Sequence, residues 1–200
     1  MPPAARLWPA GFPDGLRRSL EAAYADPARG SHDLQHLTEV LEHVDELMLP
    51  DDPARDLVLV AAWFHDAVYD GEPDDEERSA RLAADSIDEP AVAGEVARLV
   101  RLTADHRPAE DDHGGQVLCD ADLAILAADP ARYTTYVAGV RREHADVSDD
   151  DFAAGRAAVL RALLAKPTLF HTNAARERWE AAARANVERE LAQLIASSSS

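Results

Sequence analysis

The chain has few of the features that would place it in an oxidising environment or a membrane. Cys119 is the single cysteine among 200 residues, which excludes an internal disulfide framework and fits a reducing compartment. No run approaches the roughly twenty apolar residues that a membrane-spanning helix needs. The N-terminus also lacks an apolar core of signal-peptide length. We therefore expect a soluble, cytoplasmic protein that has no membrane partner.

Basic charge is scarce as well. Lys and Arg together number 20 against 38 Asp and Glu, which gives a formal net charge of −18. Without a basic face the protein cannot release counterions from a polyphosphate, so we expect no nucleic-acid polymer as a partner. A small phosphorylated ligand stays compatible with this charge if a metal ion supplies local positive charge.

Residues that favour strands are thin, since aromatic residues make up 6% of the chain and Ala, Leu, Arg and Glu dominate. This balance predicts an all-α fold. At 46% hydrophobic residues the chain can bury one core, and no repeat or low-complexity stretch divides it. We predict a single helical domain over residues 14–196, after an irregular, surface-lying segment at 1–13 and before a disordered tail at 197–200. The oligomeric state stays open, with a homodimer among the options.

Caps and prolines divide this domain into helices. Asp14 and Asp33 are typical N-caps, whereas Asp26-Pro27 and Glu89-Pro90 are typical stops. A polar loop containing His113 is expected before the sixth helix. The expected helices cover residues 14–25, 34–47, 53–66, 74–88, 91–104, 116–126, 131–143, 149–165 and 174–195.

Polar residues interrupt the apolar pattern at two of these helices. The apolar run 57–64 ends in His65-Asp66, and burying adjacent His and Asp side chains costs several kcal/mol unless they are paired or bind a metal. A His-Asp pair that simply closes a helix C-terminus is the structural alternative. Asp120 and Asp122 interrupt the run 116–126, so at least one of them should be paired or metal-bound. Because they are two residues apart, both cannot easily serve one ion.

His36 lies in the first turn of the second helix, and His32 lies in the loop before it. Only one of the two is needed as a ligand, and His36 is better placed because its helix is packed along its length. A helical bundle can bring His36, His65-Asp66 and an Asp at 120 or 122 to one point. Two imidazoles and two carboxylates suit one divalent ion, such as Mn, Fe, Co, Ni, Zn or Mg.

This pattern resembles the HD superfamily of metal-dependent phosphohydrolases, whose motif is a His, a later His-Asp pair and a final Asp. It is similar in particular to predicted HD phosphohydrolases of about this length, and the likeness runs over nearly the whole chain. The matching segments are Tyr24, Arg29, His32-x-x-x-His36, Phe64-His65-Asp66-Ala67-Val68-Tyr69, Glu76-Glu77-Arg78-Ser79-Ala80, Thr103-x-x-His106, residues 120–126, Tyr133-x-x-Tyr136, Gly155-Arg156 and residues 183–186.

The resemblance implies an HD-type helical bundle in which His36, His65, Asp66 and Asp120 bind one divalent ion. In related proteins a small residue tends to follow the last Asp by four positions, and Ala124 fits this for Asp120. We therefore prefer Asp120, with Asp122 as the alternate ligand or a supporting group. The implied activity is hydrolysis of a phosphate ester of a nucleotide or another small phosphorylated metabolite by a metal-activated water.

The remaining roles are assigned from the same resemblance. Relatives that hydrolyse alarmones have an acidic pair soon after the His-Asp, but Tyr69-Asp70 stands there in this chain. Asp66, Asp70 and Glu77 are the catalytic candidates, with Glu76 also considered as the general acid. His32, His106 and Arg107 are assigned to substrate binding. His106 could equally support a ligand or cap its own helix.

Two other functions stay open at this stage. Some HD proteins hold two irons and oxidise small substrates, which would require a second ion near His106. A non-catalytic sensor that binds a nucleotide is the other alternative, although a pure binding module has no need for an open metal site.

Overall fold

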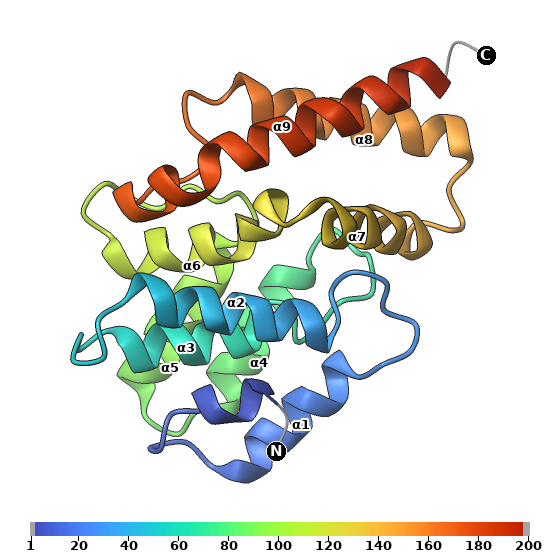
Figure 1. Cartoon of the computed structure of the whole chain (residues 1–200). Helices are drawn as coiled ribbons and strands as arrows, with labels where there is room; N and C mark the ends of the chain where they lie inside the picture. Colours follow the sequence, from blue (N-terminus) through green and yellow to red (C-terminus); the bar gives the residue numbers. More distant parts are fainter. Residues whose placement is uncertain (1–2, 198–200) are drawn as a thin grey trace.

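The computed structural model describes residues 3–197 of the chain, and over these residues the fold is all-α, as the composition predicts. Its helices pack into a single domain (Figure 1). In chain order the elements are η1 (Pro3–Leu7), α1 (Asp14–Tyr24), α2 (Leu34–Leu47), α3 (Arg55–Phe64), α4 (Asp75–Ser86), α5 (Pro90–Leu102), α6 (His113–Leu123), η2 (Ala124–Ala127), α7 (Pro130–Glu143), α8 (Asp149–Ala165) and α9 (Asn173–Ser197).

Helix α3 is the centre of the larger apolar core. Every residue from Val58 to Phe64 is buried, so α3 is covered on all sides and not only along one stripe. Helices α1, α2, α4, α5 and α6 contribute most of the other buried side chains of this first core, and η1 contributes Ala4. The apolar helix therefore delivers the residues that follow it, His65 and Asp66, to the interior.

A second, smaller core lies under η2 and α7 to α9. Its buried residues include Leu160 of α8, Val187 of α9 and Phe170, which lies between the two helices. Helices α8 and α9 run side by side at the end of the molecule opposite α1 (Figure 1). The residues that end α6 therefore lie where the two cores meet, since Leu123 packs against the second core and Leu118 belongs to the first.

The N-terminal segment differs from the irregular, surface-lying stretch expected at 1–13. Within its described part, Pro3–Leu7 forms a 3₁₀ helix in which Ala4 and Ala5 are buried. The Trp8 ring lies edge-on to Trp63 of α3, with 5.3 Å between the ring centroids. Prolines exclude an α-helix here, but they allow a short 3₁₀ turn that covers the core.

Two further boundaries differ from expectation. Helix α6 already begins at His113, because the Asp112 side chain accepts a hydrogen bond from the Gly115 N–H and caps the helix there. At the C-terminus α9 extends to Ser197, and the rest of the expected disordered tail, residues 198–200, lies outside the described residues.

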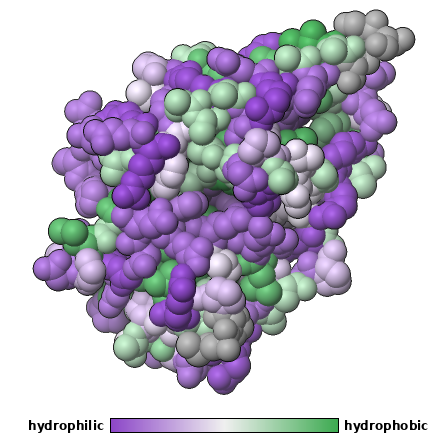
Figure 2. Space-filling model, viewed as in Figure 1, coloured by the Kyte–Doolittle hydropathy of each residue, from purple (hydrophilic) through white to green (hydrophobic). Residues whose placement is uncertain are grey.

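None of the helices within residues 3–197 combines the length and apolar character that crossing a bilayer requires. The face of the molecule in Figure 2 is mainly hydrophilic, with apolar side chains scattered over it. Such scattered apolar residues are usual on protein surfaces.

Candidate metal centre

The protonation pattern of His65 is determined by its surroundings. Its Nδ1 atom lies 2.7 Å from the carbonyl oxygen of Ala62, and a carbonyl only accepts hydrogen bonds. Nδ1 therefore holds the hydrogen, and in the neutral ring Nε2 presents a lone pair. The His65 side chain is fully buried, so no bulk water can solvate that lone pair.

Acceptors and a second imidazole surround His65 Nε2. Asp66 Oδ2 lies 3.0 Å away, His36 Nε2 3.3 Å away and Asp122 Oδ1 3.7 Å away. A buried lone pair that faces two carboxylates is unfavourable unless a proton or a cation lies between them.

The pKa values of these groups also indicate that the cluster favours a positive charge between its carboxylates. Burial lowers the pKa of His65, but the carboxylate of Asp66 and then that of Asp122 outweigh it and raise the pKa to about 9. Burial raises the pKa of Asp66, while the nearby imidazoles, first of all His65, hold it below its usual range. The pKa of Asp122 is likewise depressed despite its burial, by hydrogen bonds from His106 and His36. The cluster is thus built to hold positive charge among its acceptors.

The separations between donor atoms fit one divalent ion. Ligand bonds of about 2.1 Å place neighbouring donors roughly 3.0–3.4 Å apart in octahedral or tetrahedral coordination. His36 Nε2 lies 3.1 Å from Asp122 Oδ1 and 3.7 Å from Asp66 Oδ2. The buried residues His36, His65 and Asp66 also form a group whose ligand atoms all lie within 4.8 Å of one another. These three residues therefore offer a place for a metal ion.

Three separate elements deliver these donors, and the loops between them are tied down. His36 comes from the first turn of α2, His65 and Asp66 follow α3, and Asp122 belongs to α6. The N–H of Asp66 donates to the Tyr24 hydroxyl at 3.1 Å, and Arg29 donates to the Asp66 carbonyl at 2.7 Å. The His65-Asp66 turn is thereby held by α1 and by the loop that precedes α2.

The preference for Asp120 as a ligand is wrong in this structure. Its two carboxylate oxygens accept the backbone N–H groups of His171 and Thr172, each at 2.7 Å. These N–H groups lie just before α9, so Asp120 anchors that helix start. Asp122, on another side of α6, contacts the two imidazoles instead. The helical spacing that separates the two carboxylates gives each of them a different role.

His106 holds the second oxygen of Asp122. Its Nε2 atom lies 2.9 Å from Asp122 Oδ2, and its backbone adopts φ +53°, a conformation that non-glycine residues rarely take. The His171 side chain donates to the His106 carbonyl at 3.2 Å. The strained peptide is therefore supported by the segment that Asp120 anchors, and strain of this kind is concentrated at functional sites. Of the roles expected for His106, supporting a ligand matches this geometry directly.

His32 lies beside the cluster and is held by α7. Its Nδ1 is 3.0 Å from Glu143 Oε2, and its ring stacks on Tyr69 at a centroid distance of 4.0 Å. Burial lowers the pKa of His32, but the charges of Asp66 and Glu143 raise it overall. Glu143 also accepts the backbone N–H groups of Gly30, Ser31 and His32. This one carboxylate therefore shapes the loop that carries the imidazole.

Three predicted site residues lie elsewhere. Asp70 is exposed and pairs with Arg78 at 2.7 Å. Glu77 pairs on the surface with Arg101 at 2.6 Å and with Arg81 at 2.9 Å. Arg107 is exposed. Because the carboxylates of Asp70 and Glu77 are engaged by surface arginines, the geometry supports neither as the general acid.

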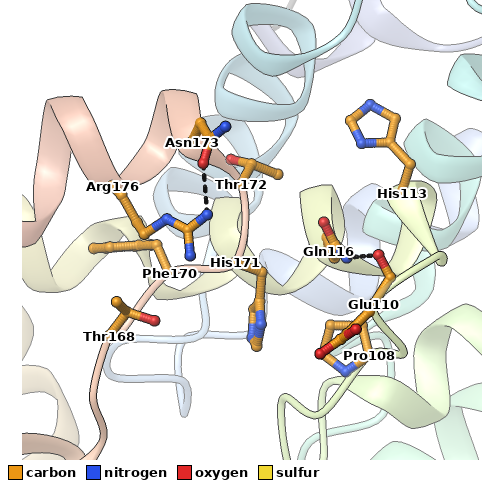
Figure 3. A pocket seen from close by; sticks show the side chains of 10 residues that line it. All are labelled: Pro108, Glu110, His113, Gln116, Thr168, Phe170, His171, Thr172, Asn173 and Arg176. Atoms are coloured by element: carbon orange, nitrogen blue, oxygen red, sulfur yellow. Dashed lines mark hydrogen bonds between the residues drawn. The ribbon is translucent and has the colours of Figure 1, made fainter.

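A cavity of about 230 Å³ opens beside the cluster, and its lining includes His32, His36, His106 and Asp122. A larger cavity of about 550 Å³ lies between α6 and the start of α9 (Figure 3). Its lining contains none of the four clustered donors, and the Arg176 side chain in it already donates to Asn173 at 2.6 Å. The smaller cavity is therefore the candidate substrate site.

Comparisons of the chain with models of protein families, with curated proteins and with solved structures return no match.

Several residues of this site had no assigned role in the sequence, and two of them carried a readable signal. Glu143 is one, although an acidic residue in the last turn of a helix opposes the helix dipole, and that conflict is a readable signal. Arg156 is the other; it lines the smaller cavity. Its signal was a charged residue within the apolar face of helix 149–165.

Proposed function

We propose that this protein is a metal-dependent phosphohydrolase of the HD type that acts on small phosphate monoesters. The observation that supports it most is the position of the buried His65 Nε2 atom, which lies among two carboxylates and a second imidazole. His36, His65, Asp66 and Asp122 would bind the ion. Their order along the chain matches the HD pattern once Asp122 replaces Asp120 as the last ligand.

A bound divalent ion in such a site lowers the pKa of a coordinated water towards neutrality and polarises a phosphoryl oxygen. In the hydrolysis, an oxygen from water forms the new bond to phosphorus, the ester P–O bond breaks, and the alcohol leaves with a proton. Asp70 and Glu77, two of the acidic residues first considered for that proton, are paired with surface arginines. His32 takes their place, because it lines the cavity and Glu143 holds its Nδ1, which leaves Nε2 for the substrate.

The contact that His106 makes favours a site with one ion over a site with two. Its Nε2 is directed at Asp122 Oδ2, where it fixes the carboxylate in the way that hydrogen bonds to metal ligands commonly do. Within the described residues, the only group with metal-ligand spacing is the one formed by His36, His65 and Asp66. We therefore favour the hydrolase over the di-iron oxygenase and over the nucleotide sensor.

The test compares His65→Ala with His113→Ala, whose imidazole is exposed and outside the cluster. The full chain is stripped with a chelator and reloaded separately with Mn²⁺, Co²⁺, Ni²⁺ and Zn²⁺. Bound metal is measured by mass spectrometry and phosphate release is measured over a panel of monoesters.

We expect His65→Ala to lose bound metal and to reduce phosphate release by at least about 100-fold, with its helical circular dichroism retained. The His113→Ala control should keep both properties. Metal retention by His65→Ala would reject the site. A loaded protein that hydrolyses no ester with any of the ions would reject the activity.

A further inference from the structure

The cavity beside the metal centre also reaches the second core. Besides the donors it is lined by Tyr136 of α7, Arg156 of α8 and apolar side chains that include Leu126, Val159 and Leu163. The cavity therefore has two parts. One lies at the metal donors, where a phosphoryl group would bind, and the other has apolar walls and the two polar side chains of Tyr136 and Arg156.

The positive charge of Arg156 is already neutralised. Its guanidinium donates to both oxygens of Glu190, at 2.7 and 3.1 Å. Glu190 is buried and accepts a further hydrogen bond of 2.5 Å from the Tyr133 hydroxyl. Because this pair is buried and bidentate, Arg156 has no net charge to offer a phosphate.

Arg156 instead orients Tyr136. It donates to the Tyr136 hydroxyl oxygen at 3.3 Å, and its guanidinium lies over the Tyr136 ring at 5.3 Å from the centroid. The hydroxyl oxygen is thus used as an acceptor, while its own hydrogen has no acceptor among the contacts of residues 3–197. Tyr136 can therefore donate a hydrogen bond into the cavity.

The size and walls of the cavity restrict what can fill it. Its volume of about 230 Å³ is below the roughly 300–1,000 Å³ of pockets that take drug-sized ligands. A bound ion and its water would use part of that space. One face of the Tyr136 ring is covered by Arg156, so a nucleobase could stack on the other face only.

We propose that the substrate is a phosphate monoester with a short, mainly apolar organic group that carries one neutral oxygen acceptor, and that Tyr136 selects this acceptor. This inference rests on the proposed function and narrows it: it favours compact esters over nucleoside monophosphates. Tyr136 would bind the uncharged end of the molecule while the phosphoryl group lies at the metal centre.

Two matched pairs of compounds test it. Hexylphosphonate and ethoxypropylphosphonate have equal chain lengths, are not hydrolysed, and differ by one ether oxygen. Their dissociation constants are measured by calorimetry on the metal-loaded full chain. Pentyl phosphate and ethoxyethyl phosphate are the corresponding esters, and a nucleoside monophosphate serves as the large substrate for kcat/KM.

We expect Tyr136→Phe to reduce the preference for the ether compound by about 3- to 10-fold, the effect of one neutral hydrogen bond. Thr135→Val is the control, since it also removes one hydroxyl group from α7, at an exposed position outside the cavity lining. We expect this control to prefer the ether compound as strongly as the unmodified chain does. A Tyr136→Phe preference equal to that of the unmodified chain would overturn the role of Tyr136.

The size limit has its own readout. The unmodified chain should give a higher kcat/KM for ethoxyethyl phosphate than for the nucleoside monophosphate, and Leu163→Ala, which widens the cavity, should narrow that difference. A higher kcat/KM for the nucleoside monophosphate would overturn this inference and leave the phosphohydrolase standing. Binding of the phosphonates without hydrolysis of any ester would reject the phosphohydrolase and support the binding site alone.

Discussion

Asp120 and Asp122 show how two identical side chains on one helix acquire different tasks. Asp120 satisfies two backbone N–H groups before α9, whereas Asp122 faces His36 and His106. Both are partly or fully buried carboxylates, so composition alone does not distinguish them. Their partners distinguish them, because Asp120 accepts hydrogen bonds from backbone amides and Asp122 contacts imidazoles.

This division predicts opposite outcomes for the two Asp→Asn variants. Asp122→Asn should weaken metal binding by at least about 10-fold. Asp120→Asn should keep a full equivalent of metal but lose about 1–3 kcal/mol, because a buried acceptor of two N–H groups is impaired. Metal titrations and urea unfolding of both variants measure these effects. Loss of metal from Asp120→Asn alone would contradict the assignment.

Much of the site could be predicted from residue types, and its limits have physical causes. His65 and Asp66 stood out because an imidazole and a carboxylate seldom end an apolar helical run without a partner. His36 stood out because it lies in the first turn of a helix that is packed along its length. Helical spacing showed that Asp120 and Asp122 diverge, but not which of them faces α2. The partners of Asp120 lie 51 and 52 residues further along the chain. Nor could local sequence show that Arg101 would engage Glu77.

At the scale of elements, α7 is fixed against the loop before α2 by two glycines. A Cβ on Gly139 would lie 2.6 Å from the Gly30 carbonyl oxygen, and one on Gly30 would lie 2.2 Å from that of Gly139. This close approach brings Glu143, at the end of α7, to the backbone N–H groups around His32. Neither position can take a side chain, because the atoms that a Cβ would meet first are backbone atoms.

Replacing a glycine by alanine should therefore have opposite effects in α7 and α8. Gly139→Ala should destabilise the protein by about 1–3 kcal/mol, because the loop or helix must shift. Gly155→Ala is the matched control: a Cβ there meets nothing within 4 Å, so helix propensity should stabilise it by about 0.5–1 kcal/mol. Urea unfolding midpoints give both values. Equal stabilisation in the two variants would show that the contact is not tight.

The order of elements could be read from the sequence more fully than their contacts. Expected helices at 131–143 and 149–165 match α7 and α8 closely, since proline and serine-aspartate starts are local signals. Residues 3–7 were read as irregular because prolines exclude an α-helix, yet their burial depends on Trp63, far along the chain. Local rules identify elements, while burial of a short segment depends on distant partners.

For the whole molecule, the proposed metal ligands come together only through tertiary packing. The donors come from α2, from the turn after α3 and from α6, which share the first core. The unfolded chain would not hold His36, His65 and Asp122 together. A ligand that binds the native state alone stabilises it by mass action.

Chelation should therefore lower the melting temperature of the entire domain. At a metal concentration about 100 times the dissociation constant, binding adds roughly 2.7 kcal/mol, which corresponds to about 5–10 °C for a chain of this size. Differential scanning calorimetry with and without chelator measures the shift, and His65→Ala should show none. An unchanged melting temperature for the chelated unmodified chain would mean that the cluster does not bind the added ion.

Cys119 can report whether the packing that brings the proposed ligands together is intact. The thiol is wholly buried on α6, beside Asp120, and burial raises its pKa well above the usual value. It is also the only sulfhydryl in the chain. An alkylating reagent can therefore react only after α6 separates from the first core. The rate of thiol modification thus measures the opening of the helix that supplies Asp122.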